Sequence, residues 1–324
     1  LEDGIGGKHL QRVVGWWCSS DDLVAKDSSI ALVEAESPSQ IRDEFEFSGL
    51  SVVCTNPQTD SYADYRCDFE LWEVDSGFMM YIGCNVTYSK FFDDGTLRTF
   101  LTYGIDRQTL VDDNYGGLAL PTTLPISPMS PYYSKSLAAN YDYDEMRFID
   151  AASKFRVPTN DKGVPRTLQL LVNSDDSARL RCARNIAATL TELGLACETV
   201  ESPTSVYEAR LQAANYDIYL GITKLPTTAD LSEFYRPWGE MSWGGLANET
   251  IYNMVNQSLA DRGNYYNLHK LVADDGRIIP VMAGYYAIYA KRGVLSDLNP
   301  ARDNVFYYTL GKTMESSKVA TQFS

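Results

Sequence analysis

The chain has 324 residues, a formal net charge of −15 and 12% aromatic residues. This length leaves room for two domains or one large one, and the aromatic content favours a folded protein over a disordered one. The acidic balance argues against nucleic-acid binding, which needs a basic surface, and no window of about 20 residues is apolar enough to span a bilayer.

The histidines and cysteines give no sign of a metal site. The two histidines are too few for a histidine-based site, and the six cysteines lack zinc-type spacing. Cys54 and Cys67 flank a short loop and could form a disulfide, whereas Cys182 and Cys197 are separated by about 15 Å of helix rise. We therefore expect mostly free thiols, with room for one disulfide, and neither a metal nor a cofactor.

The first elements in chain order are a short helix and two strands. Residues 37–49 have the pattern of a helix capped by Ser37 or Ser39. Residues 50–55 (LSVVCT) and 77–85 (GFMMYIGCN) have the apolar runs of strands.

Residues 96–117 (TLRTFLTYGIDRQTLVDDNYGG) have the pattern of one amphipathic helix that ends in an acidic run and a double glycine. At its centre we expect Asp106 and Arg107 to be structural polar groups that fix the helix to its neighbours. The three prolines of residues 124–137 then predict an extended surface segment. The helix residues expected to pack inward are Leu97, Phe100, Leu101, Gly104 and Ile105.

The middle of the chain has the clearest pattern. Residues 167–173 (TLQLLVN) are a short apolar run typical of a buried parallel strand. Ser174, Asp175 or Asp176 could cap the helix that follows, and Gly194 could end it. The order strand, helix, strand, helix, strand predicts a parallel sheet covered by helices. The four later elements of this unit are expected at residues 174–194, 196–201, 205–215 and 216–222.

The last part of the chain predicts two helices and two strands. Residues 247–263 and 266–276 have the apolar faces of helices. Residues 277–293 (RIIPVMAGYYAIYAKRG) predict a pair of strand-like runs, interrupted by Pro280 and Gly284.

Most catalytic motifs are absent. The chain has no Gly-x-Ser-x-Gly sequence, no Walker-type loop and no dinucleotide-binding fingerprint. The acidic pairs Asp93–Asp94 and Asp274–Asp275 could serve a carboxylate-based hydrolase, which is the alternative from another functional class. Each pair lies in a predicted turn, where solvated helix caps are the favoured interpretation.

Several segments in fixed order resemble one known family. The strand ending YIGCN is followed by a Phe-x-Asp turn and a helix containing Ile-Asp-Arg, then by the proline-rich residues 117–133, the helix of residues 141–155 and the β-α-β-α-β unit. This order is similar to the oligopeptide/dipeptide-binding family (family 5) of extracellular solute-binding proteins of ABC transporters. The matching residues of the turn and helix are Phe92, Asp93, Arg98, Ile105, Asp106 and Arg107.

The resemblance implies an α/β, periplasmic-binding-protein-like two-lobed fold, here one complete lobe plus part of the other. Residues 1–78 would be part of lobe I, with 1–26 unplaced, residues 79–291 would be lobe II, and residues 292–324 would return to lobe I and form a tail. A family member normally has further sequence before this region. We therefore expect this chain alone to bind ligand weakly.

The resemblance also implies a function without catalysis. The chain would be the extracytoplasmic solute-binding component of an ABC importer, binding peptides or similar small polar solutes in a cleft and delivering them to the permease. A ligand-sensing module without transport is an alternative. No nucleic-acid partner is expected, and membrane contact is expected only through a lipid anchor outside this chain.

The ligand-facing loop is expected at residues 223–248, directly after the third strand of the central unit. Many family members carry a Trp and an Asp there, and the Asp pairs with the ligand's α-ammonium group. Here those positions hold Ile222 to Leu225, which weakens the case for binding a free amino terminus. The candidate contacts, which combine charges, aromatic area and close backbone approach, are Lys224, Asp230, Tyr235, Trp238, Trp243 and Gly244.

Overall fold

The computed structural model describes residues 2–4, 7–11, 14, 29–47, 49–56, 65–294, 300 and 302. The chain divides into two compact units: unit 1 contains residues 1–76 and 285–324, and unit 2 contains residues 77–284. Two long strands, β5 (Phe69–Cys84) and β10 (Ile278–Lys291), have residues in both units. The predictions for residues 15–26 and for the tail 303–324 lie outside the described residues.

The described residues of unit 1 include a small antiparallel sheet and a helix. Strands β1 (Glu2–Gly4), β2 (Gly7–Gln11) and β3 (Ser29–Leu32) pair in that order. Helix α1 (Pro38–Phe47) begins after Ser37, whose Oγ accepts a hydrogen bond from the main-chain N of Gln40 at 3.2 Å. Of the two predicted caps, Ser37 therefore caps this helix.

A further strand of unit 1 carries Cys54, one of the two cysteines considered for a disulfide. Strand β4 (Val52–Thr55) pairs antiparallel with β10, and Cys54 lies opposite Ile288. Cys54 and Cys67 are both free thiols, so the disulfide considered for them is wrong. Lying on either side of a short loop therefore does not place the two sulfur atoms within bonding distance.

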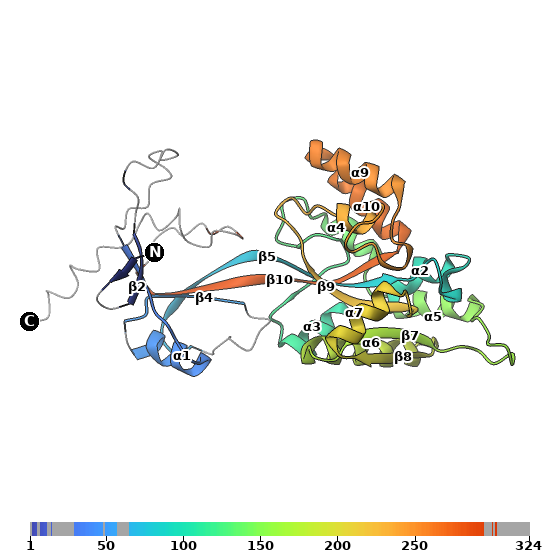
Figure 1. The fold of residues 1–324 in the computed structure, drawn as a ribbon, viewed down its shortest axis with the longest axis horizontal. Helices are drawn as coiled ribbons and strands as arrows, with labels where there is room; N and C mark the ends of the chain where they lie inside the picture. Colours follow the sequence, from blue (N-terminus) through green and yellow to red (C-terminus); the bar gives the residue numbers. More distant parts are fainter. Residues whose placement is uncertain are drawn as a thin grey trace, which may run out of the picture. The chain divides into compact units, whose positions relative to one another are not determined.

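The predicted β-α-β-α-β unit is confirmed in unit 2. Strand β7 (Leu168–Asn173) lies between β8 (Cys197–Ser202) and β9 (Ile218–Lys224) and runs parallel to both. The full strand order is β4-β10-β5-β9-β7-β8, and β6 (Leu120–Pro121) pairs with β10. The connecting helices α6 (Ser177–Glu192) and α7 (Thr204–Gln212) follow β7 and β8 (Figure 1).

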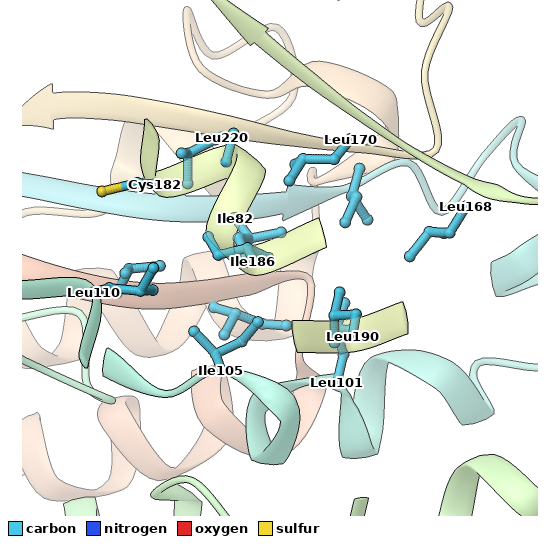
Figure 2. Packing of buried hydrophobic residues seen from close by; sticks show 14 of the residues in the cluster. Ile82, Leu101, Ile105, Leu110, Leu168, Leu170, Cys182, Ile186, Leu190 and Leu220 are labelled. Atoms are coloured by element: carbon cyan, nitrogen blue, oxygen red, sulfur yellow. The ribbon is translucent and has the colours of Figure 1, made fainter. Parts of the chain in front are cut away.

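One face of this sheet is covered by α6 and the helices before it. Because neighbouring strand residues point to opposite faces, Met80 and Ile82 enter this core while Met79 and Tyr81 enter the other. Figure 2 shows Ile82 with Ile186 and Leu190 of α6 among the buried side chains of this core. The other helices on this face are α2 (Thr96–Phe100), α3 (Arg107–Tyr115) and α5 (Glu145–Lys154).

The opposite face is covered by the later helices, and its core is rich in tyrosine. Helices α9 (Glu249–Ala260) and α10 (Tyr265–Asp275) pack side by side on this face (Figure 1). The rings of Tyr81 and Tyr219 meet edge to face with centroids 5.7 Å apart. A Cβ at Gly221 would lie only 2.6 Å from Cζ of Tyr81, so glycine is required there for the ring to fit. The helices on this face are α4 (Lys135–Ala138), α7, α8 (Ser232–Tyr235), α9 (Glu249–Ala260) and α10 (Tyr265–Asp275).

The single helix predicted over residues 96–117 is broken. Helix α2 passes into the 3₁₀ turn η2 (Leu101–Gly104), and α3 begins at Arg107. Asp106 is the N-cap of α3, with its carboxylate accepting from the main-chain N of Thr109 at 3.1 Å. The expected inward-facing residues are nevertheless all buried. The other 3₁₀ turns are η1 (Lys90–Phe92), η3 (Ala139–Tyr141), η4 (Trp243–Gly245) and η5 (Arg262–Asn264).

Two further predictions need correction. Residues 124–137 do not lie wholly on the surface, because residues 124–127 are buried and Thr122 Oγ1 donates to the main-chain oxygens of Leu124 and Ile126. The pair of strands predicted over residues 277–293 is one continuous strand, β10. Pro280 is accommodated within it, although proline donates no ladder hydrogen bond.

Candidate functional site

The three parallel strands of unit 2 end at one edge of the sheet. Asn173 closes β7 opposite Ser202, which closes β8, and β9 runs on to Lys224. Ligands of open α/β sheets bind outside the carboxyl ends of their strands. We call this region the strand-end site and define it by Asn173, Asp175, Arg179, Thr204, Tyr207 and Lys224.

A hydrogen-bonded clamp joins the loops after β7 and β8. Asn173 Nδ2 donates to Thr204 Oγ1 at 3.0 Å, and Asn173 Oδ1 accepts from the main-chain N of Asp175 at 2.9 Å. The Asp175 carboxylate in turn accepts from the main-chain N and the hydroxyl of Thr204, at 2.8 and 2.7 Å. These bonds lower the pKa of Asp175, so it stays ionised and holds the two loops together at neutral pH.

Arg179 brings a buried positive charge to this edge. It lies in the first turn of α6 and is 6% exposed, and its Cζ stands 5.4 Å from the centre of the Tyr207 ring. Its buried Nε has no hydrogen-bond partner within the described residues, and the guanidinium forms an ion pair with Asp176, whose Oδ2 lies 3.6 Å from Nε. A buried guanidinium with unused donors is expensive unless it meets an acceptor, so Arg179 is suited to bind an anionic group.

The six predicted contacts do not form one cluster. Lys224 ends β9 at the strand-end site, opposite Phe78 of β5. Asp230 lies six residues further and is half-buried, and its Oδ1 accepts from the main-chain N and the hydroxyl of Ser232 at the start of α8. Only Lys224 of the six therefore lies at the carboxyl end of a parallel strand.

The aromatic residues of the loop differ sharply in exposure. Tyr235 is fully buried in the core of the α7–α10 face. Trp238 is 95% exposed and has a positive φ of 61° in the turn from Arg236 to Gly239. The backbone of the turn holds the indole in solvent rather than against the sheet.

Trp243 and Gly244 lie toward the opposite end of the sheet. The main-chain oxygen of Gly244 accepts from Thr87 N at 3.2 Å, just beyond Asn85, and Asn85 N bonds Asp217 O before β9 begins. A Cβ at Gly244 would stand 2.6 Å from the Tyr216 hydroxyl. The loop thus starts at the strand-end site and returns to the amino ends of the strands, with Trp243 half-buried against the core.

Local sequence patterns predict only structural roles for most residues of the strand-end site. The pattern of α6 predicts Asp175 only as a helix cap, and Thr204 and Tyr207 fall within a predicted strand-to-helix segment. Arg179 carries a readable signal, because it precedes Ala183, Ile186 and Leu190 on the apolar stripe of α6 at helical spacing. A charged residue on a buried stripe marks either a structural ion pair or a site.

Three of the four carboxylates considered for hydrolysis, Asp94, Asp274 and Asp275, make structural contacts. Asp275 Oδ1 accepts from Arg98 at 2.8 Å, and Asp275 Oδ2 lies 3.2 Å from Arg277 Nε. Asp274 accepts from the Tyr141 hydroxyl at 2.5 Å and pairs with Lys270. Asp94 accepts from the main-chain N of Thr96, the first residue of α2, at 2.8 Å. None of these contacts is the arrangement of two free carboxyl groups that glycoside hydrolysis requires.

In the part of the chain that the structure describes, no group of three or more His, Cys, Asp or Glu side chains is placed to hold a metal ion. No described helix has the length and apolar character to cross a membrane.

A protein-family model matches about two thirds of the chain. The family model described as bacterial extracellular solute-binding proteins, family 5, middle part, matches residues 32–245. No curated protein sequence matches the chain.

Solved structures give the fold. The ABC transporter substrate-binding protein CtaP from Listeria monocytogenes matches with a TM-score of 0.71 and 13% identity over 94% of this chain and 63% of its own. NikA from Brucella suis, solved with Fe(III)-EDTA, matches with a TM-score of 0.68 and 15% identity over 97% of this chain and 66% of its own.

A third structure is the oligopeptide-binding protein AppA from Bacillus subtilis, in complex with a nonapeptide. It matches with a TM-score of 0.59 and 16% identity over 75% of this chain and 52% of its own. The predicted fold class is confirmed: the chain has the α/β fold of the two-lobed periplasmic binding proteins and spans only part of their length.

Proposed function

The chain belongs to family 5 of the bacterial extracellular solute-binding proteins, and we propose that it binds a peptide or similar small polar solute with an anionic group at the strand-end site. In this proposal the protein delivers that solute to the permease of an ABC importer. The family consists of solute-binding proteins rather than enzymes.

The proposal rests on the environment of the Arg179 guanidinium. Its side chain is 6% exposed, lies over the Tyr207 ring at a cation–π distance, and pairs with Asp176 while its Nε keeps no hydrogen-bond partner among the described residues. It also lies at the N-terminus of α6, where the helix dipole favours negative charge. A carboxylate placed beside it would receive charge-assisted hydrogen bonds in a partly desolvated setting.

The clamp beside Arg179 prepares the edge for a ligand. Because Asp175 is satisfied by Thr204, its negative charge is held by donors and does not have to pair with Arg179. The Asn173–Thr204 hydrogen bond joins the loops after β7 and β8, so this edge of the sheet is ordered before any ligand binds. Such preorganisation lowers the entropic cost of binding.

We also propose roles for the two charged residues of the loop after β9. Lys224 would add a second positive charge at the strand-end site, and Asp230 would meet a ligand amine. The contacts predicted for Tyr235, Trp238, Trp243 and Gly244 stay predictions. We further propose that unit 2, residues 77–284, corresponds to the lobe predicted for residues 79–291.

The proposal is tested by screening the purified chain against a mixture of two- to five-residue peptides with ligand-observed NMR, which detects weak binding. A second mixture carries the same peptides with amidated carboxyl termini. We expect signals from members of the first mixture and their loss in the second. Equal signals from both mixtures would show that no carboxylate is recognised.

A further inference from the structure

A hollow lies in unit 2, away from the strand-end site. It has a volume of about 390 Å³, within the range of small-molecule sites. Its walls come from the start of α3, from β6, from α4 and from the segment after η3, and it shares no residue with the strand-end site. We call it the α3–α4 cavity, and its charged lining residues are Asp106, Arg107, Lys135 and Asp142.

Two of these four charges are held in place by the fold. Asp106 Oδ2 accepts from the Thr109 hydroxyl at 2.7 Å as part of the α3 cap. Arg107 is 4% exposed and donates to the main-chain oxygens of Pro280, Ile105 and Thr102, which carry no charge. The wall thus has a fixed anion and a fixed cation side by side.

The other two charges line the cavity without a hydrogen-bonded partner among the described residues. Asp142 and Lys135 are exposed, and neither side chain makes a hydrogen bond or an ion pair in that part of the chain. Pro121, Ala138 and Ala139 supply an apolar lining between the charged groups. A ligand could therefore reach one carboxylate and one ammonium group over a surface that needs little desolvation.

The two positive and two negative charges together determine which class of ligand the α3–α4 cavity favours. A simple anion would gain from Arg107 and Lys135 but would be repelled by Asp106 and Asp142, and a simple cation would meet the reverse. We propose that the α3–α4 cavity binds a small zwitterion, with the ammonium group at Asp142 and the carboxylate at Lys135. The volume admits a molecule of amino-acid or dipeptide size.

The test is saturation-transfer NMR on the whole chain with the protein amino acids and the glycyl dipeptides as probes. We expect at least one zwitterionic probe to bind, and its N-acetylated form not to bind. Asp142→Asn and Lys135→Met should each weaken that binding at least tenfold. Because both side chains are exposed, neither variant should lower the melting temperature.

Two control variants separate binding in this cavity from binding elsewhere on the protein. Lys154→Met removes an exposed lysine of α5 that pairs with Asp150 outside the cavity, and it should leave binding unchanged. A probe that binds at the strand-end site instead should lose its binding in Arg179→Met and keep it in Asp142→Asn, so the two proposals fail separately. The inference is overturned if no zwitterion binds, or if every zwitterion that binds is insensitive to Asp142→Asn.

Discussion

Replacing Arg107 tests how the broken helix is stabilised. The break between η2 and α3 frees main-chain oxygens that a continuous helix would use, and the Arg107 guanidinium donates to two of them, Thr102 O at 3.3 Å and Ile105 O at 3.2 Å. It also donates to Pro280 O at 2.8 Å, which links α3 to β10. Arg107→Met keeps most of the side-chain volume but removes every donor.

The expected cost follows from these bonds. Each buried acceptor left without its donor costs about 1–3 kcal/mol, and the relief from burying a charge offsets part of the sum. We therefore expect a loss of about 3 kcal/mol in the free energy of unfolding. For a unit the size of unit 2, that loss lowers the melting temperature by about 6–12 °C.

The measurement is thermal and urea unfolding followed by circular dichroism. Asp106→Ala removes only the α3 cap and should cost about 1 kcal/mol. Gln108→Ala, on the exposed face of the same turn, should cost less than about 0.5 kcal/mol. The reasoning is refuted if Arg107→Met is no more destabilising than Gln108→Ala.

Three further predictions concern packing, pH and ligand type. Gly221→Ala should cost about 1–3 kcal/mol in urea unfolding because its Cβ would meet the Tyr81 ring, whereas Gly49→Ala, with open space around it, should cost almost nothing. Burial lowers the pKa of His269 from 6.5 to about 4, so the unfolded state binds more protons and stability falls as the pH drops from 6.5 towards 4. His269→Phe should remove about 3 kcal/mol of that pH dependence, and equal dependence in both proteins would contradict this. If Asp230 meets a ligand amine, Asp230→Asn should weaken a peptide but not its N-acetylated form in calorimetric titrations; an unchanged preference would reject the role.

The central α/β unit could be predicted because its signals are local. The apolar run of β7, the cap at Asp176 and the stop at Gly194 all lie within or beside the elements they define. The break at Asp106 depends instead on a distant partner, since Arg107 bonds Pro280 at the far end of the sequence of unit 2. Periodicity alone therefore predicts one helix where there are two.

The sequence indicates where in the fold the candidate site is expected, but not which residues form it. The rule that ligands bind at the carboxyl ends of parallel strands directs attention to the loop after β9, and Lys224 lies there. The path of that loop back to Asn85 depends on the contacts of Gly244 with Asn85 and Tyr216, which no local pattern encodes. Arg179 stands out only as a charged residue on the apolar stripe of α6, a pattern that predicts a structural ion pair as readily as a site.

The most direct test of the central claim is a double-variant cycle on the Arg179–carboxylate contact. Calorimetry would measure the dissociation constants of one carboxylate peptide and its amide, each with the natural chain and with Arg179→Met. Arg181→Met, on the exposed side of the same helix, is the matched control. We predict that amidation weakens binding by about 10- to 100-fold in the natural chain and in the control, but hardly at all in Arg179→Met. An amidation effect of the same size in all three proteins would contradict the assignment of Arg179 as the anion-binding residue.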